Sequence, residues 1–180
     1  MTTRLEEEHA VVLSIDDWAD RWRSPASICW LDRLHAYWDE QRAEAAMPDA
    51  DELFLADLVE IMPYLTLGYR DDWRDAFRIE FAGQAVTALL GTELVDRYPE
   101  ETDSDDALVW LGDGYASVRV LGAPGTSRSR NGALVALHLP YVQVDGHVGL
   151  ILSGVALWPY LTHSNGNHPV RPERSRPARR

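Results

Sequence analysis

The most informative segment for the fold of this chain is Phe77–Tyr98, FRIEFAGQAVTALLGTELVDRY. It opens with apolar residues at every second position, Phe77, Ile79 and Phe81. Polar side chains lie between them, so the pattern predicts a strand with one buried and one exposed face. The two-residue period ends at Gly83, which separates the strand from a segment of different periodicity.

The spacing after this glycine is that of a helix. Val86, Leu89 and Leu90 recur at helical intervals. Gly91 ends the helix, because glycine adopts positive φ without steric cost. We expect the strand and the short helix to form the wall of a small cavity.

The composition is ordinary for a soluble globular protein. Apolar residues make up 46% and charged residues 26% of the 180 residues. No apolar run approaches the ~20 residues that span a bilayer. The single cysteine, Cys29, allows neither an internal disulfide nor a thiolate metal cluster. Lysine is absent, which excludes Schiff-base chemistry and a P-loop lysine. We therefore expect a cytoplasmic protein that does not insert into a membrane.

The charge is unevenly distributed along the chain. The net charge is -12, and residues 171–180 hold five arginines and one glutamate. That segment carries +4, so residues 1–170 carry -16. Such an acidic body repels nucleic acid and anionic membranes. We interpret residues 161–180 as a disordered, arginine-rich tail, with contact to an acidic partner as the alternative.

Four tryptophans lie in the first 38 residues, within a segment (1–47) that we interpret as helical. The spacing predicts a short helix over 15–22 and a longer one over 24–46. Their wide apolar stripe needs a large partner surface. Two interpretations remain open, packing on the protein's own sheet and a dimer interface. The interface residues would be Trp18, Trp22, Trp30 and Trp38.

The middle of the chain alternates between strand and helix patterns. Residues 53–62 resemble a short helix, and a strand over 65–69 forms a hairpin with the Phe77 strand. A helix is predicted over 106–117, and 118–120 is interpreted as the start of a strand. Residues 126–131 are interpreted as an exposed loop.

Asp145-Gly146 marks the clearest hairpin, because this dipeptide suits two-residue turns. With that turn, residue 144 faces 147, 141 faces 150 and 138 faces 153. Both strands are apolar on both faces, so both sides of the sheet must be covered. The element order predicts an antiparallel α+β domain.

Several short motifs occur in a fixed order along the chain. They are Tyr37-Trp38, LVEIMPYL (58–65), FRIEFAG (77–83), GTEL (91–94) and HLP (138–140) before Asp145-Gly146. In this order and spacing they resemble a family of short bacterial single-domain PAS-like proteins, over about Leu31 to Trp158. The resemblance implies a five-stranded antiparallel sheet with helices on one face, a small cavity and a sensing or adaptor role. It assigns residues 48–160 to the PAS-like domain, with the N-terminal helices on the other face or in a dimer.

We expect a non-enzymatic sensor that binds a small, largely apolar molecule beside the Phe77 strand. Filling the pocket would bias helix packing or dimer geometry, and the signal would leave through contact with a protein partner or a second copy. No residue is predicted to be catalytic. The predicted pocket lining is Phe77, Ile79, Phe81, Val86, Leu89, Leu90, His138 and Leu139.

No metal or cofactor is predicted. His138 and His147 would lie about 20 Å apart along their strands, too far to share a zinc ion. The segment 103–117, which contains the predicted helix, lacks the axial histidine of haem-binding PAS domains. Cys29 lies far from the position of the reactive cysteine in flavin photoreceptors. On these grounds neither haem nor flavin is supported.

Two alternatives stay open beside the sensor. The first is a dimerisation or scaffold module whose cavity is filled by bulky side chains such as Phe81, Leu89, Leu139 and Leu150. The second is a small cone-shaped α+β isomerase or hydrolase, which requires a buried carboxylate paired with His138.

Overall fold

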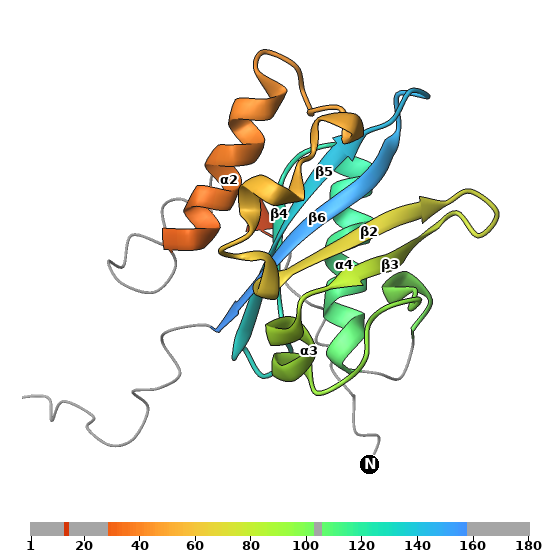
Figure 1. Cartoon of the computed structure of the whole chain (residues 1–180). Helices are drawn as coiled ribbons and strands as arrows, with labels where there is room; N and C mark the ends of the chain where they lie inside the picture. The colour runs from red at the N-terminus through yellow and green to blue at the C-terminus, as the bar shows by residue number, and fades with distance from the viewer. Residues whose placement is uncertain (1–12, 15–28, 103–105, 158–180) are drawn as a thin grey trace, which may run out of the picture.

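The computed structural model describes residues 13–14, 29–102 and 106–157. It contains one antiparallel sheet in the order β1-β4-β5-β6-β2-β3 (Figure 1). β1 has only two residues, so the main body is the five-stranded antiparallel sheet predicted from the sequence. The strands are β1 (Leu13–Ser14), β2 (Leu65–Asp71), β3 (Ala76–Ala82), β4 (Gly125–Arg128), β5 (Leu134–Val142) and β6 (Val148–Leu157).

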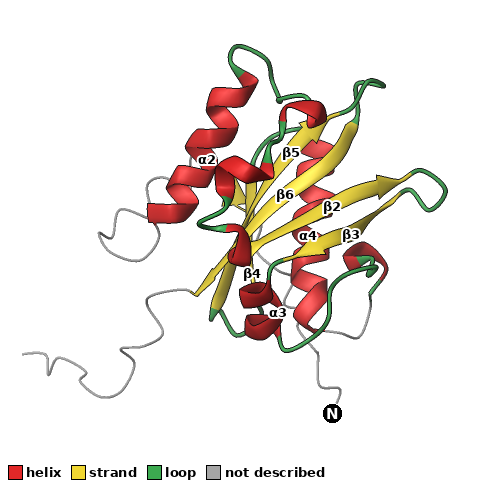
Figure 2. Cartoon of the chain, viewed as in Figure 1, coloured by secondary structure: helices red, strands yellow, loops and turns green. Residues whose placement is uncertain are grey.

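Helical elements cover both faces of the sheet (Figure 2). Helix α2 (Cys29–Arg42) and three 3₁₀ turns cover one face, and α3 (Gln84–Leu90) and α4 (Asp106–Leu121) cover the other. We call these the α2 layer and the α4 layer. The 3₁₀ turns are η1 (Ala50–Glu52), η2 (Leu55–Leu58) and η3 (Met62–Tyr64) in the α2 layer, and η4 (Pro99–Glu101) before α4.

Helix α2 packs on β5 and β6 at close range. A Cβ at Gly154 of β6 would lie 2.8 Å from side-chain atoms of Trp30, Leu31 and Leu34. Only glycine allows this approach. Trp38 is buried, and its Nε1 donates a 2.7 Å hydrogen bond to the carbonyl of Pro140 in β5.

Phe81 lies on the opposite side of the sheet from Phe77 and Ile79, which corrects the predicted shared face. Leu67 pairs with Phe81 and Gly68 pairs with Ile79, so Glu80 is the extra residue of a β-bulge. The extra residue reverses the alternation. Phe81 therefore packs in the α2 layer, whereas Phe77 and Ile79 are buried in the α4 layer.

The β5–β6 hairpin has the predicted register in its body and a different turn. Tyr141 pairs with Leu150 and His138 pairs with Ser153, as expected. At the tip, however, the amide of Gln143 donates to the carbonyl of His147 at 3.0 Å, so the loop has three residues. Gly146 supplies the positive φ of 82° that such a loop requires.

Three other predictions about elements are wrong. Residues 118–120 are helical, because α4 continues to Leu121 with Leu111, Tyr115 and Val118 buried at helical spacing. The predicted loop over 126–131 contains most of β4, where Thr126 and Ser127 are buried. The predicted helix over 53–62 is replaced by separate 3₁₀ turns, at Leu55–Leu58 and Met62–Tyr64.

The short helix predicted over 15–22 and the tail predicted over 161–180 lie outside the described residues. Among the described helices, none has both the length and the apolar character that crossing a membrane requires.

Candidate functional site

A buried histidine lies at the centre of the α4 layer. His138 of β5 is fully buried, and its Nδ1 lies 2.8 Å from the Ser153 hydroxyl of β6. Its Nε2 lies 2.7 Å from the Ser127 hydroxyl of β4. Strand pairing sets this geometry, because Ser153 is directly opposite His138 across β5 and β6. One histidine thus bridges three neighbouring strands.

Tyr115 of α4 extends this cluster to β2. Its ring contacts His138 edge-on, with centroids 5.5 Å apart and planes at 88°. Its hydroxyl lies 3.2 Å from Oγ1 of buried Thr66. Ser153 also hydrogen-bonds the Tyr115 side chain. We call Thr66, Tyr115, Ser127, His138 and Ser153 the buried polar chain.

Burial keeps the imidazole neutral. Desolvation lowers the pKa of His138 to about 3, and it raises the pKa of Tyr115 above its usual value. A neutral imidazole has one donor and one acceptor nitrogen, so one of the two serines donates and the other accepts. Every polar atom of the His138 side chain is then satisfied within the protein.

Two glycines let the helix and the sheet close around this cluster. A Cβ at Gly114 of α4 would meet Nε2 of His138 below the 3.0 Å that real contacts respect. A Cβ at Gly68 of β2 would lie 2.7 Å from the Tyr115 ring. The role of Gly114 is to admit the imidazole of His138.

The structure divides the predicted pocket residues between the two layers. Most of them lie in the α4 layer, whereas Phe81 and Leu139 belong to the α2 layer. The predicted set therefore cannot line one cavity. Those in the α4 layer are Phe77, Ile79 and Val86, which are buried, Leu89 and Leu90, which pack against them, and His138.

The residues that the enzymatic alternative requires do not meet in the described structure. His138 is hydrogen-bonded by Ser127 and Ser153 rather than by a carboxylate. Both serines are fully buried, so neither is open to a substrate. Within the described ranges, no three metal-ligating side chains come together.

The predicted interface tryptophans also separate. Trp38 is a core residue, and Trp30 is half-buried, with its ring 5.5 Å from that of Tyr64 in η3. The protein's own sheet thus covers this face of α2. Trp18 and Trp22 lie outside the described residues.

A cleft that the sequence did not predict lies in the α2 layer. It has a volume of about 110 Å³ between α2 and the turns after residue 54. Large apolar side chains stay exposed close to it in sequence, with Phe54 and Val59 each 63% and Tyr64 42% exposed. The cleft is lined by Arg33, Tyr37, Asp57, Leu58, Glu60 and Ile61.

Hydrogen bonds hold one wall of the cleft against α2. The Tyr37 hydroxyl donates to the Phe54 carbonyl at 3.3 Å and accepts from the Phe54 amide at 3.2 Å. Gln41 donates to the same hydroxyl at 2.8 Å and to the Glu52 carbonyl. It also accepts from Tyr141 of β5 at 2.9 Å. These hydrogen bonds hold the backbone of Phe54 in place, while its side chain stays exposed.

The cleft carries more acidic than basic groups. Arg33 and Glu60 form a 3.5 Å ion pair across it, and both side chains are mostly exposed. Asp57 has no ion-pair partner among the described residues. Burial is the main cause that raises the pKa of Tyr37, and the nearby Asp57 carboxylate adds to it. In the sequence, this cleft is marked only by acids and large apolar residues mixed over 51–64, a pattern that was interpreted as part of a short helix.

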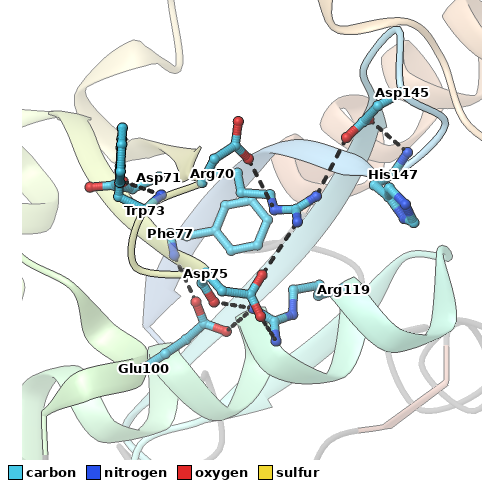
Figure 3. A network of polar contacts seen from close by, with 10 residues as sticks. Arg70, Asp71, Trp73, Asp75, Phe77, Glu100, Arg119, Asp145 and His147 are labelled. Atoms are coloured by element: carbon cyan, nitrogen blue, oxygen red, sulfur yellow. Dashed lines mark hydrogen bonds and ion pairs between the residues drawn. The ribbon is translucent and has the colours of Figure 1, made fainter.

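A second polar network fastens the hairpin tips to α4 (Figure 3). Arg70 of β2 pairs with Asp75 at 3.3 Å and with Asp145 of the β5–β6 turn at 3.7 Å. Arg119 of α4 pairs with Asp75 at 3.5 Å and with Glu100 at 3.6 Å. Arg70 thus connects two loops that lie far apart in the sequence.

Replacing Arg70 with glutamine is expected to lower the free energy of unfolding by about 1 kcal/mol, because the Arg70 side chain is partly buried and serves several carboxylates. Urea unfolding at low salt measures the loss. The matched control, R33Q, removes a single exposed pair and should cost only about 0.3 kcal/mol. Equal losses for the two variants would show that the network adds nothing beyond isolated surface pairs.

The fold and the buried cluster together define a class of protein. It is an antiparallel α+β domain with helices on both faces, a closed polar interior and no open catalytic constellation among the described residues. Residues 29–101, less than half of the chain, match the family model described as a PAS domain, which confirms the resemblance seen in the sequence. The matched region includes α2.

The search of solved structures finds a similar chain described as "Flavin Analogue Sheds Light on Light-Oxygen-Voltage Domain Mechanism". The two chains are 12% identical, and the TM-score is 0.40. The alignment covers 60% of this chain and 86% of that one. No match is found among curated proteins.

The prediction that rejected flavin is wrong as an exclusion, because this light-oxygen-voltage domain was described with a flavin analogue. The prediction relied on the position of Cys29, and the position of one thiol tests covalent photochemistry rather than binding. In the described interior, Tyr115 and His138 occupy the space between α4 and the sheet.

Proposed function

We propose that this protein is a non-enzymatic sensory adaptor that passes its signal through protein contact at the α2 layer. The observation that supports the proposal is the contrast between the two layers. In the α4 layer the Tyr115 and His138 side chains are fully buried against one another, whereas the α2 layer has a cleft whose lining lies close in sequence to exposed Phe54, Val59 and Tyr64.

Physical considerations favour contact at that surface. Several exposed apolar side chains close together are characteristic of interaction sites, and aromatic residues are enriched at interface centres. The backbone of Phe54 is held by Tyr37, so little conformational entropy is lost when a partner binds there. A second copy of this chain is the alternative partner, although two acidic bodies repel one another.

The test compares protein partners cross-linked in the native host. A double variant, F54S/V59S, is expected to reduce recovery of a specific partner at least tenfold, because it removes both large exposed apolar side chains. The control is W73S, which removes a side chain that is 99% exposed at the β2–β3 tip. Equal recovery with F54S/V59S and the unmodified chain would refute the proposal. A loss confined to W73S would move the contact to the hairpin tip.

A second candidate function is the binding of a small, largely apolar molecule in the α4 layer. Its support is the apolar lining by Phe77, Ile79 and Val86 around the buried polar chain. A ligand there must displace the Tyr115 ring from the interior. Native mass spectrometry of gently purified protein decides between the two candidates. A stoichiometric small molecule that raises the melting temperature supports ligand sensing. If no such molecule is found, ligand sensing is rejected and contact signalling is the remaining candidate.

A further inference from the structure

The cleft of the α2 layer has the features of a docking site for a basic segment. Its floor is apolar, with Leu58 buried and Ile61 half-buried. Asp57 lies in the lining without an ion-pair partner among the described residues. Residues 50–64 contain four acids and no basic residue. An occupant that supplies cations therefore gains both charge pairing and aromatic contact.

We infer that residues 171–180 of this same chain occupy the cleft and cover the contact surface. The segment is RPERSRPARR, with a net charge of +4 against -16 for residues 1–170. All of its cations are arginines. The guanidinium group pairs with carboxylates in a fixed geometry and stacks on aromatic faces, which the tyrosine and phenylalanine side chains of this surface offer.

The described chain ends on the side of the molecule from which α2 starts (Figure 1). Leu157 ends β6, three residues after Gly154, which contacts Trp30 and Leu34 in the first turns of α2. The Trp30 ring in turn lies 5.5 Å from that of Tyr64, beside the cleft. Figure 1 shows the end of β6 on the side of the molecule where α2 begins. The segment from Leu157 to Arg171 can extend up to about 46 Å, so the arginines reach the cleft.

Because residues 171–180 belong to the same chain as the cleft, weak contacts are enough for them to dock there. One exposed ion pair contributes only about 0–1 kcal/mol. A short linker, however, holds the segment at an effective concentration on the order of millimolar. The covered fraction then lowers the apparent affinity of a partner for the same surface, which makes residues 171–180 a built-in competitor. This regulatory role rests on the proposed function, whereas the docking itself is measurable without any partner.

The test uses two-dimensional NMR of the full chain at low salt. A variant with glutamine at all five arginines of 171–180 keeps the chain length and removes the charge. We expect it to shift the amide signals of residues 33, 37 and 57–61 relative to the unmodified chain. The two spectra should converge in about 0.5 M salt, where the Debye length is a few ångströms. Proteins diluted tenfold should give the same result, because the contact is intramolecular.

Charge-matched surface variants locate the site. D57N/E60Q should abolish most of the difference caused by the five arginines. The control, E93Q/D113N, removes two carboxylates from the α4 side and should preserve it. Identical cleft signals with and without the arginines would refute the inference, as would shifts confined to another surface. A concentration-dependent difference would assign the docking to a second copy and refute the intramolecular form. None of these outcomes bears on the recovery of a cross-linked partner.

Discussion

Replacing Gly114 with valine is expected to lower the free energy of unfolding by about 3 kcal/mol or more. A Cβ at this position overlaps Nε2 of His138, which is fully buried and fixed by two serines. Overpacking of this kind costs about 1–3 kcal/mol. Displacing the imidazole also breaks its hydrogen bond to Ser127, which costs about 1–3 kcal/mol when the partner stays buried. Chemical denaturation monitored by circular dichroism measures the loss.

The control for this experiment is A116V, an exposed position of the same helix. Valine there carries the helix-propensity cost of roughly 0.6 kcal/mol without touching the sheet. A loss for G114V no larger than that for A116V would mean that α4 does not press on His138. The inference that α4 and the sheet close around His138 would then be wrong.

The second large effect concerns the stability contributed by His138 and its dependence on pH. Replacing His138 with glutamine should destabilise the protein by about 2 kcal/mol at pH 7.5, because the buried serines lose well-placed partners. This difference should shrink by roughly 2.5 kcal/mol as the pH falls to 4.5, so that the variant equals or exceeds the unmodified protein. Urea unfolding at both pH values measures the two differences.

The sign of this pH dependence follows from which state, folded or unfolded, binds the proton. The pKa of His138 is about 3 in the folded protein and 6.5 in the unfolded chain. Above pH 6.5 both states hold a neutral imidazole, so its stabilisation is complete. Below pH 6.5 only the unfolded chain takes up the proton, and stability falls by about 1.4 kcal/mol per pH unit until about pH 3. The control H147Q removes a histidine at an exposed turn that has no part in the buried polar chain.

The sequence predicted those elements whose signals are local. The strand at Phe77, the glycine-terminated helix α3 and the body of the β5–β6 hairpin are present as predicted. The β-bulge at Glu80 was missed because it depends on pairing between β2 and β3, which alternation in one strand does not report. Phe81 was placed on the wrong face for that reason.

The candidate sites were harder to predict than the fold. His138 was expected to line a cavity, and its hydrogen bonds to Ser127 of β4 and Ser153 of β6 make it a satisfied core residue. The hairpin register predicted that His138 faces Ser153, whereas Ser127 was missed because residues 126–131 were interpreted as a loop. The cleft of the α2 layer depends on Tyr37 and Phe54, which are 17 residues apart. The Tyr37–Phe54 contact is tertiary, so the periodicity of apolar residues within one segment cannot predict it.

The most direct test is nitrogen-15 NMR of the imidazole of His138 in the intact chain between pH 8 and pH 5. A layer closed by the protein's own side chains predicts a neutral ring in one tautomer, with no titration over this range and slow exchange of its N–H proton. A ring that titrates near pH 6.5 with rapid exchange would show an open, hydrated cavity and contradict contact signalling from a filled domain.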